Sequence, residues 1–195
     1  MIAETEKANV IYQYLKQNNF NAIDYSDLLR FQWVQVISAL DKFMHDLILA
    51  GITNVYLKKR PITPALKSFK ATNLHNIIVD FDSSKSESER LSSLQQLIIE
   101  ANSFKSFQKP EKIAEGLACI WEEAQKWQKI SAQMKRDERQ VKTELSNIST
   151  RRDQIVHESD YQAASLGRQN IIEGDTKIAI DFIKKLGKAI YECVK

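Results

Sequence analysis

Glycine, proline and cysteine are all scarce in this chain of 195 residues, which has five glycines, three prolines and two cysteines. Few glycines and prolines leave little material for tight hairpin turns, so a largely helical protein is expected. Cys119 and Cys193 stand far apart and form no Cys-x-x-Cys pair, which argues against a structural zinc site and against a disulfide framework. Both are expected to be reduced thiols in a cytoplasmic protein.

Long hydrophobic runs and a strong excess of one charge are also missing. No run approaches the roughly eighteen apolar residues of a membrane span, and no apolar region follows a basic start, so neither a membrane association nor export is predicted. The net charge is only +3, which allows RNA to bind at a local patch but not over the whole surface.

Three histidines without a metal-binding spacing give no reason to expect a metal or another cofactor. The absence of a glycine-rich loop excludes P-loop and Rossmann nucleotide sites.

Helical periodicity dominates what is present. The length fits one domain, and residues 1–195 are interpreted as a single all-α unit. A first amphipathic helix is expected from Ala3 to Asn18. A long central helix follows from about Tyr25 to Leu49, with Asp24 as a plausible N-cap, and Gly51 marks its end or a kink. The central helix carries a broad apolar stripe: Leu29, Trp33, Val36, Ile37, Leu40, Phe43, Met44, Leu47 and Ile48.

Four more helices are predicted in the second half of the chain. One follows the polar link at residues 83–88, one runs from Pro110 through Trp121, one covers about Ala132 to Val156, and the last spans about Asp175 to Val194. The last helix is expected to pack Ile178, Phe182, Leu186 and Ile190 on one face. The run at residues 76–81 is rich in β-branched side chains and is interpreted as a short extended or irregular segment.

An arginine and a histidine end the helix expected at 132–156. Apolar residues repeat in steps of four and three up to Ile148, and the next position of that stripe is Arg152. A guanidinium is costly to bury without a partner, so Arg152 requires an acid, a water-filled cleft or a subunit interface. The alternative is that its methylene stem packs while the charged end reaches solvent.

His157 follows Arg152 by five residues, which places it about 140° further round a straight helix. The two side chains can converge only if the helix ends or bends there, or if a second subunit brings its own copy. The small and polar residues at 162–170 indicate that the helix ends soon after Val156. A histidine that caps the last helical carbonyls is the alternative to a catalytic one.

The segment Arg151 to Asp160, RRDQIVHESD, resembles the signature of HEPN domains, which is an arginine, a polar residue, three further residues and a histidine. Arg152, Asp153 and His157 match those three positions. Two more segments are similar to the branch called RiboL-PSP-HEPN: WVQVISALDKFMHDLILAG at 33–51 and FQKPEKIAEGL at 107–117. The resemblance extends from about residue 24 to residue 195.

This resemblance implies a helical bundle and a metal-independent endoribonuclease that acts as a homodimer. Two copies of the motif would face each other across a two-fold axis and form one composite cleft. His157 would be the general acid or base in the attack of the ribose 2′-OH, Arg152 would stabilise the charged transition state, and Asp153 would orient one of them. The family also implies a toxin or antiphage-defence effector, with RNA as substrate and a cognate antitoxin or defence-system partner.

Two alternatives remain open from the sequence. The chain could be a non-catalytic HEPN module that binds a nucleotide, RNA or a partner protein, because a fold does not guarantee an activity. It could also be a dimerising subunit of a toxin–antitoxin or defence complex in which the motif is kept for structure.

Further residues are candidates for supporting roles. Asp41 and His45 are four apart on the central helix, a spacing at which the carboxylate could orient the imidazole, although an exposed ion pair explains it as well. Glu158 adjoins the motif histidine. The cations Lys135, Arg139, Lys142 and Arg151 are candidates to follow an RNA backbone, or equally to lie on a solvated helix face.

Overall fold

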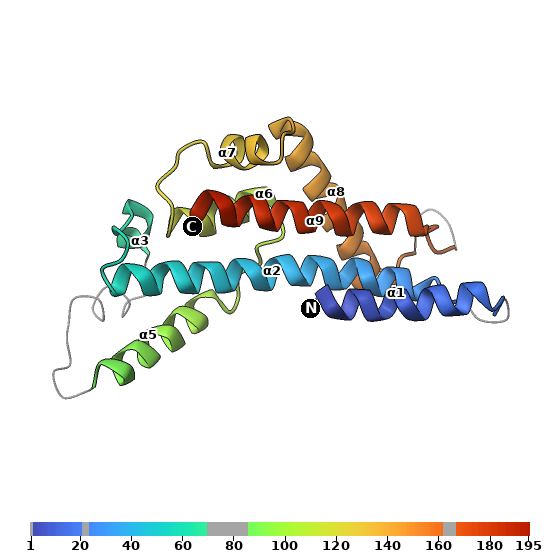
Figure 1. The fold of residues 1–195 in the computed structure, drawn as a ribbon, viewed down its shortest axis with the longest axis horizontal. Coiled ribbons are helices and arrows are strands. Elements are labelled where there is room, and N and C mark those ends of the chain that lie inside the picture. The colour runs from blue at the N-terminus through green and yellow to red at the C-terminus, as the bar shows by residue number, and fades with distance from the viewer. Residues whose placement is uncertain (1, 21–23, 70–85, 162–166) are drawn as a thin grey trace.

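The computed structural model describes residues 2–20, 24–69, 86–161 and 167–195. Within these ranges the chain forms eight α-helices and no β-strand (Figure 1), so the all-α prediction is confirmed. The predicted extended segment at 76–81 lies outside the described residues. None of the described helices combines the length and the apolar character that crossing a membrane requires.

The longest helix, α2 (Asp27–Tyr56), is the centre of the bundle. Its 30 residues correspond to a length of about 45 Å. Around it lie α1 (Ile2–Gln17), α3 (Pro64–Ser68), α5 (Glu87–Asn102), α6 (Pro110–Ala118), α7 (Lys126–Gln133), α8 (Glu138–His157) and α9 (Glu173–Val194). Helix α2 contacts α1, α5, α6, α8 and α9. In Figure 1, α9 runs beside α2, α1 covers the N-terminal half of α2, and α5 leans away near its other end.

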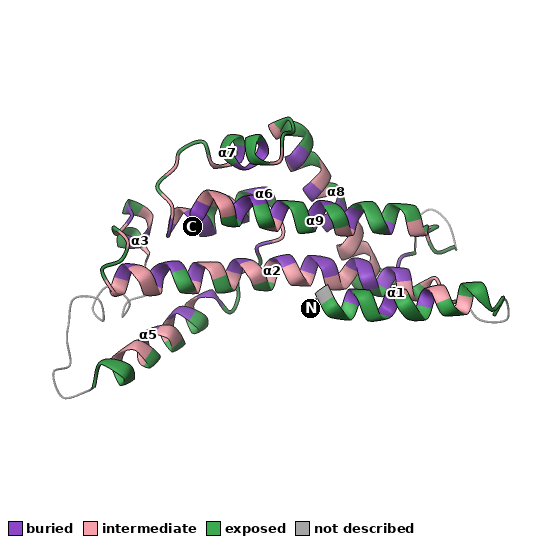
Figure 2. Cartoon of the chain, viewed as in Figure 1, coloured by how far each residue is buried: buried purple, intermediate pink, exposed green. Residues whose placement is uncertain are grey.

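The predicted apolar stripe of α2 forms the core. Seven of its nine residues are buried, and Phe43 and Leu47 are partly buried against them; Figure 2 shows buried positions recurring along the length of the helix. In α9 the prediction was wrong for Ile178, whose side chain is 62% exposed. The buried face of α9 instead runs through Ala179, Phe182 and Ile183, about 100° away from Ile178.

The predicted end of α2 was also wrong. The helix continues past Leu49 and Gly51 to Tyr56. Gly51 is buried inside it, at a place where a Cβ atom would lie 2.5 Å from the side chain of Ile120. The glycine therefore permits a close approach of two segments and does not stop the helix. The actual stop lies at Lys58, which adopts the left-handed conformation with φ of 58°.

The helix predicted from Ala132 to Val156 is α8, which begins only at Glu138, while Ala132 and Gln133 form the end of the separate helix α7. Lys135 has a φ of 55° and closes α7, and Asp137 then caps α8 by accepting a hydrogen bond from the Gln140 amide at 3.0 Å. The same left-handed closure by lysine ends both α2 and α7, where sequence reasoning expects glycine or asparagine.

Two hydrogen bonds between distant segments fix α8 against the rest of the bundle. The indole of Trp33 in α2 donates to the carbonyl of Ile148 at 3.0 Å. The hydroxyl of the buried Ser149 donates to the carbonyl of Gln108 at 2.7 Å. Helix α8 is thereby held between the central helix and the segment that precedes α6.

Candidate active site

The motif helix α8 ends at His157, and the chain then reverses through two residues in the left-handed region. Ser159 has a φ of 50° and Asp160 a φ of 67°. Asp160 closes the turn, because its amide donates to the carbonyl of Gln154 at 3.1 Å and its carbonyl accepts from the amide of Gln169 at 2.7 Å. Aspartate tolerates this backbone conformation better than most residues, but holding it still requires fixed surroundings.

Those surroundings are two arginines that enclose the Asp160 carboxylate. Arg30 of α2 approaches it through Nε at 2.6 Å, and Arg151 of α8 through Nη1 at 2.5 Å and Nη2 at 2.9 Å. Asp160 is completely buried. The arginines also donate to the carbonyls of Gln169 and Asn170, at 2.8 and 3.2 Å. This Arg30–Asp160–Arg151 cluster ties the end of α8 to the start of α2.

The structure therefore corrects the prediction that Arg151 contacts the RNA backbone. Its guanidinium faces Asp160 inside the protein and is not free to follow an RNA backbone. Its side chain is 15% exposed. Burial lowers the pKa of this guanidinium, Asp160 opposes that effect, and the nearby Arg30 adds to it. Arginine stays charged even so. Arg151 is a structural cation, so its replacement is not a neutral control for that of Arg152.

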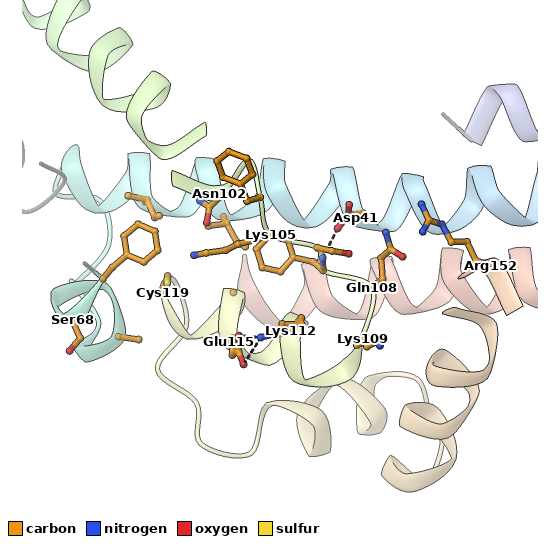
Figure 3. Close-up of a pocket in the computed structure, with 18 of the residues that line it drawn as sticks. Asp41, Ser68, Asn102, Lys105, Gln108, Lys109, Lys112, Glu115, Cys119 and Arg152 are labelled. Atoms are coloured by element: carbon orange, nitrogen blue, oxygen red, sulfur yellow. Dashed lines mark hydrogen bonds and ion pairs between the residues drawn. The ribbon is translucent and has the colours of Figure 1, made fainter. Parts of the chain in front are cut away.

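Arg152 points in another direction, into a pocket of about 920 Å³. Its side chain is 20% exposed, and its Nη1 donates to Asp153 at 3.0 Å. Its Nε is buried and has no hydrogen-bond partner in the described parts of the chain. In Figure 3, Arg152 lies at one end of this pocket and Cys119 and Ser68 at the other. Arg152 thus lies in a cleft with a mixed polar and apolar lining, and Asp153 is the acid that its place in an apolar stripe requires.

His157 does not join Arg152 within one chain. Both belong to the same helix, so the angle of about 140° between them persists. His157 is exposed and is absent from the lining of the pocket that holds Arg152. Two large apolar side chains are also exposed beside it, Val156 at 43% and Tyr161 at 49%. Glu158, the C-cap residue, is exposed as well.

Asp41 and His45 both contact Phe107, and no hydrogen bond joins the two within the described residues. The Asp41 carboxylate accepts a hydrogen bond from the Phe107 amide at 2.5 Å. The His45 ring packs edge-on against the Phe107 ring, with 4.8 Å between centroids. The predicted orienting pair on α2 is therefore a pair of anchors for the segment that leads into α6.

A comparison with known protein families finds a match over almost the whole chain. The sequence model of the family RiboL-PSP-HEPN matches residues 2–195. The chain belongs to the RiboL-PSP-HEPN family. No curated protein matches the chain, and no solved structure does. Membership in a HEPN family indicates a nuclease or RNA-binding module in general terms.

The basic residues proposed from the sequence lie far from the motif of this HEPN chain. Arg139 and Lys142 are in the first turns of α8 and Lys135 is in the turn before it. Thirteen residues of helix separate Arg139 from Arg152, which is about 20 Å. These three cations remain candidates for RNA contact only outside the immediate site.

Three other cations line the Arg152 pocket of the HEPN domain, and sequence reasoning missed them: Lys105, Lys109 and Lys112. The sequence feature that could have indicated them is the run FKSFQKP at residues 104–110, in which lysines alternate with aromatic residues.

Cys119 also lines the pocket. Burial raises the pKa of its thiol, so Cys119 is protonated and unreactive there. The described residues contain no cluster of three side chains able to hold a metal ion.

Proposed function

We propose that this HEPN protein is an endoribonuclease that acts as a homodimer and cleaves RNA without a metal ion. One observation carries the proposal: Arg152 lines a pocket, and His157 lies at the exposed end of the same helix. The first residue supplies a fixed positive charge and the second an imidazole, the side chain that enzymes use most often as general acid or base.

A second copy of the chain is needed because the two side chains diverge within one copy. Val156 and Tyr161 flank His157 and leave apolar surface exposed at the end of α8. A two-fold axis close to this surface would cover it and bring the His157 side chains of both copies to the Arg152 pockets. The site would then contain two histidines and two arginines.

The chemistry follows from these four groups. One His157 takes the proton of the ribose 2′-OH, whose oxygen attacks the adjacent phosphorus atom. The other His157 gives a proton to the leaving 5′-oxygen, so proton gain and loss balance. Arg152 donates to the phosphoryl oxygens as charge builds on them. Asp153 holds the guanidinium through Nη1. The products are a 2′,3′-cyclic phosphate and a free 5′-hydroxyl.

The biological setting we propose is a toxin or antiphage-defence effector with a cognate antitoxin or another defence partner. Expression of the chain should then slow bacterial growth, and His157→Ala should restore it. Growth arrest that persists with His157→Ala would assign the toxicity to something other than RNA cleavage.

The direct test is cleavage of a single-stranded RNA by the purified protein in excess EDTA. We expect cleavage to continue and the upstream fragments to end in a 2′,3′-cyclic phosphate, because the 2′-OH is the nucleophile. Activity that disappears with EDTA and returns with magnesium or manganese would contradict the proposal. Binding of RNA with no cleavage under any condition would favour the non-catalytic HEPN module.

A further inference from the structure

The pocket that holds Arg152 extends well beyond it, toward an aromatic side chain at its rim. Phe104 lines this pocket and is 100% exposed. It lies in the segment between α5 and α6, two residues after the buried Asn102, which lines the same pocket. A completely exposed phenylalanine contributes nothing to the packing of its own chain, and at the edge of this pocket its ring face is open to stack on a bound group.

We propose that the part of the pocket from Arg152 to Phe104 binds the single-stranded flank of the RNA, with one base stacked on the Phe104 ring. This inference rests on the proposed nuclease function, which would place the reacting phosphate at Arg152. Stacking on aromatic rings is the usual way that proteins hold single-stranded bases, because every base has a π-face.

The charges along the pocket fit a phosphate backbone. In Figure 3, Lys105 lies between Arg152 and Cys119, and Lys109 and Lys112 lie along the side formed by α6. All three acids of the lining are engaged: Asp41 accepts from the Phe107 amide, Glu115 is paired with Lys112 at 2.9 Å and Asp153 with Arg152 at 3.0 Å. Lys105 is placed over the Phe69 ring at 4.2 Å. Lys109 is exposed at the start of α6, directly beside the pocket.

The size of the pocket also fits more than one nucleotide. A volume of about 920 Å³ is at the upper end of the roughly 300–1,000 Å³ typical of small-molecule sites. The pocket is long, with Arg152 and Cys119 toward opposite ends. A nucleotide flank that starts at Arg152 would therefore continue along the lysines toward Phe104.

Binding can be measured without cleavage by using a fluorescent single-stranded oligonucleotide of 2′-O-methyl RNA, in which the nucleophile is blocked. We expect Phe104→Ala to raise its Kd about 10-fold, because one stacked base is lost, and Phe104→Tyr to bind within a factor of two of the wild type. Lys109→Ala should raise the Kd several-fold and reduce the slope of log Kd against log salt by about 1. Ile99→Ala and Lys188→Ala, exposed positions outside this pocket, are the controls and should leave the Kd unchanged.

The inference would be overturned by an unchanged Kd for Phe104→Ala, by a Phe104→Tyr variant that binds as weakly as Phe104→Ala, or by a wild type that does not bind the oligonucleotide. Loss of the dimer in Phe104→Ala, measured by light scattering, would instead assign this ring to a subunit contact and also overturn it. If the oligonucleotide binds as expected but unmodified RNA is not cleaved, the nuclease proposal fails and this one stands. If RNA is cleaved but the replacement of Phe104 changes neither Kd nor KM, this inference fails and the nuclease proposal stands.

Discussion

Arg151 of α8 and Asp160 of the following turn form an ion pair of 2.5 Å in which the carboxylate is completely buried. Arg30 of α2 closes on the same carboxylate at 2.6 Å, although 130 residues separate the two in the chain. Asp160, the centre of the cluster, lies three residues beyond His157. It therefore fixes the place where α8 ends, and with it the direction in which the proposed catalytic histidine leaves the helix.

Asp160→Ala should destabilise the fold strongly, because it leaves two arginines buried without their common partner. Removal of one member of a buried ion pair costs about 3–5 kcal/mol. Unfolding by urea, followed by circular dichroism, measures the loss. Asp153→Ala removes an acid that is 41% exposed and serves as the control, with an expected change below about 1 kcal/mol. Equal stabilities of the two variants would contradict the role given to the cluster.

The two adjacent arginines of the motif should respond differently to replacement. Arg151→Ala removes a partner of the buried Asp160 and should lower the stability by about 3 kcal/mol. Arg152→Ala should keep most of the stability and lower cleavage of RNA at least about 10²-fold, the scale of losing one preorganised donor to the transition state. Melting temperature and cleavage rate, recorded for both variants, separate the two roles. The opposite pattern would mean that the motif arginine is Arg151.

Much of this fold is predictable because its signals are local. The apolar stripe of α2 and the low content of glycine and proline are sufficient for a long central helix in an all-α domain. The ends of the helices are less predictable. Gly51 is needed for contact with Ile120 and not for a stop, while Lys58 and Lys135 take the left-handed conformation without the usual sequence signal.

Only the part of the candidate site that lies on one helix could be predicted from the sequence. The order of Arg152, Asp153 and His157 is visible in the sequence, since it depends on neighbouring positions alone. The contacts of Asp160 with Arg30 and of Asp41 with Phe107 join segments 130 and 66 residues apart. Periodicity carries no information about such pairs. The composition of the pocket around Arg152 is hidden for the same reason.

The protein should be a dimer in solution, with Val156 at the contact. Light scattering at micromolar concentration should give about twice the chain mass of 22.5 kDa. Val156→Asp should shift the protein toward the monomer, because it places a charge on a surface that the second copy covers. Ile99→Asp, at an apolar residue of α5 that is also half exposed, should remain a dimer. A wild type that is monomeric at tens of micromolar would remove the composite site.

Acid should weaken the contact between α1 and α9. Glu173 accepts hydrogen bonds from Lys16, Lys177 and Gln13, which lower the pKa of its carboxyl group to about 2 from an ordinary 4.5. The ionised form is favoured in the folded state, so its contribution is complete above pH 4.5 and is lost as the pH falls toward 2. Glu173→Gln should lower the stability at pH 7 by on the order of 1 kcal/mol.

The difference between Glu173→Gln and the wild type should shrink as the pH falls through this window, which urea unfolding at several pH values measures. Asp181→Asn, an exposed acid on the same helix, is the control and should show no such dependence. A difference that is constant from pH 7 to pH 2 would show that the ionisation of Glu173 does not matter for stability.

The central claim is that His157 moves the protons when RNA is cleaved, and a comparison of His157→Ala with the wild type on one defined RNA tests it most directly. The residue is exposed at the end of α8, so its loss should leave the melting temperature and the dimer mass nearly unchanged. Thr150→Ala, an exposed position on the same helix, controls for replacement as such. The account predicts that His157→Ala lowers the cleavage rate in EDTA at least about 10²-fold, while Thr150→Ala cleaves like the wild type. A folded, dimeric His157→Ala protein that cleaves at the wild-type rate would contradict it.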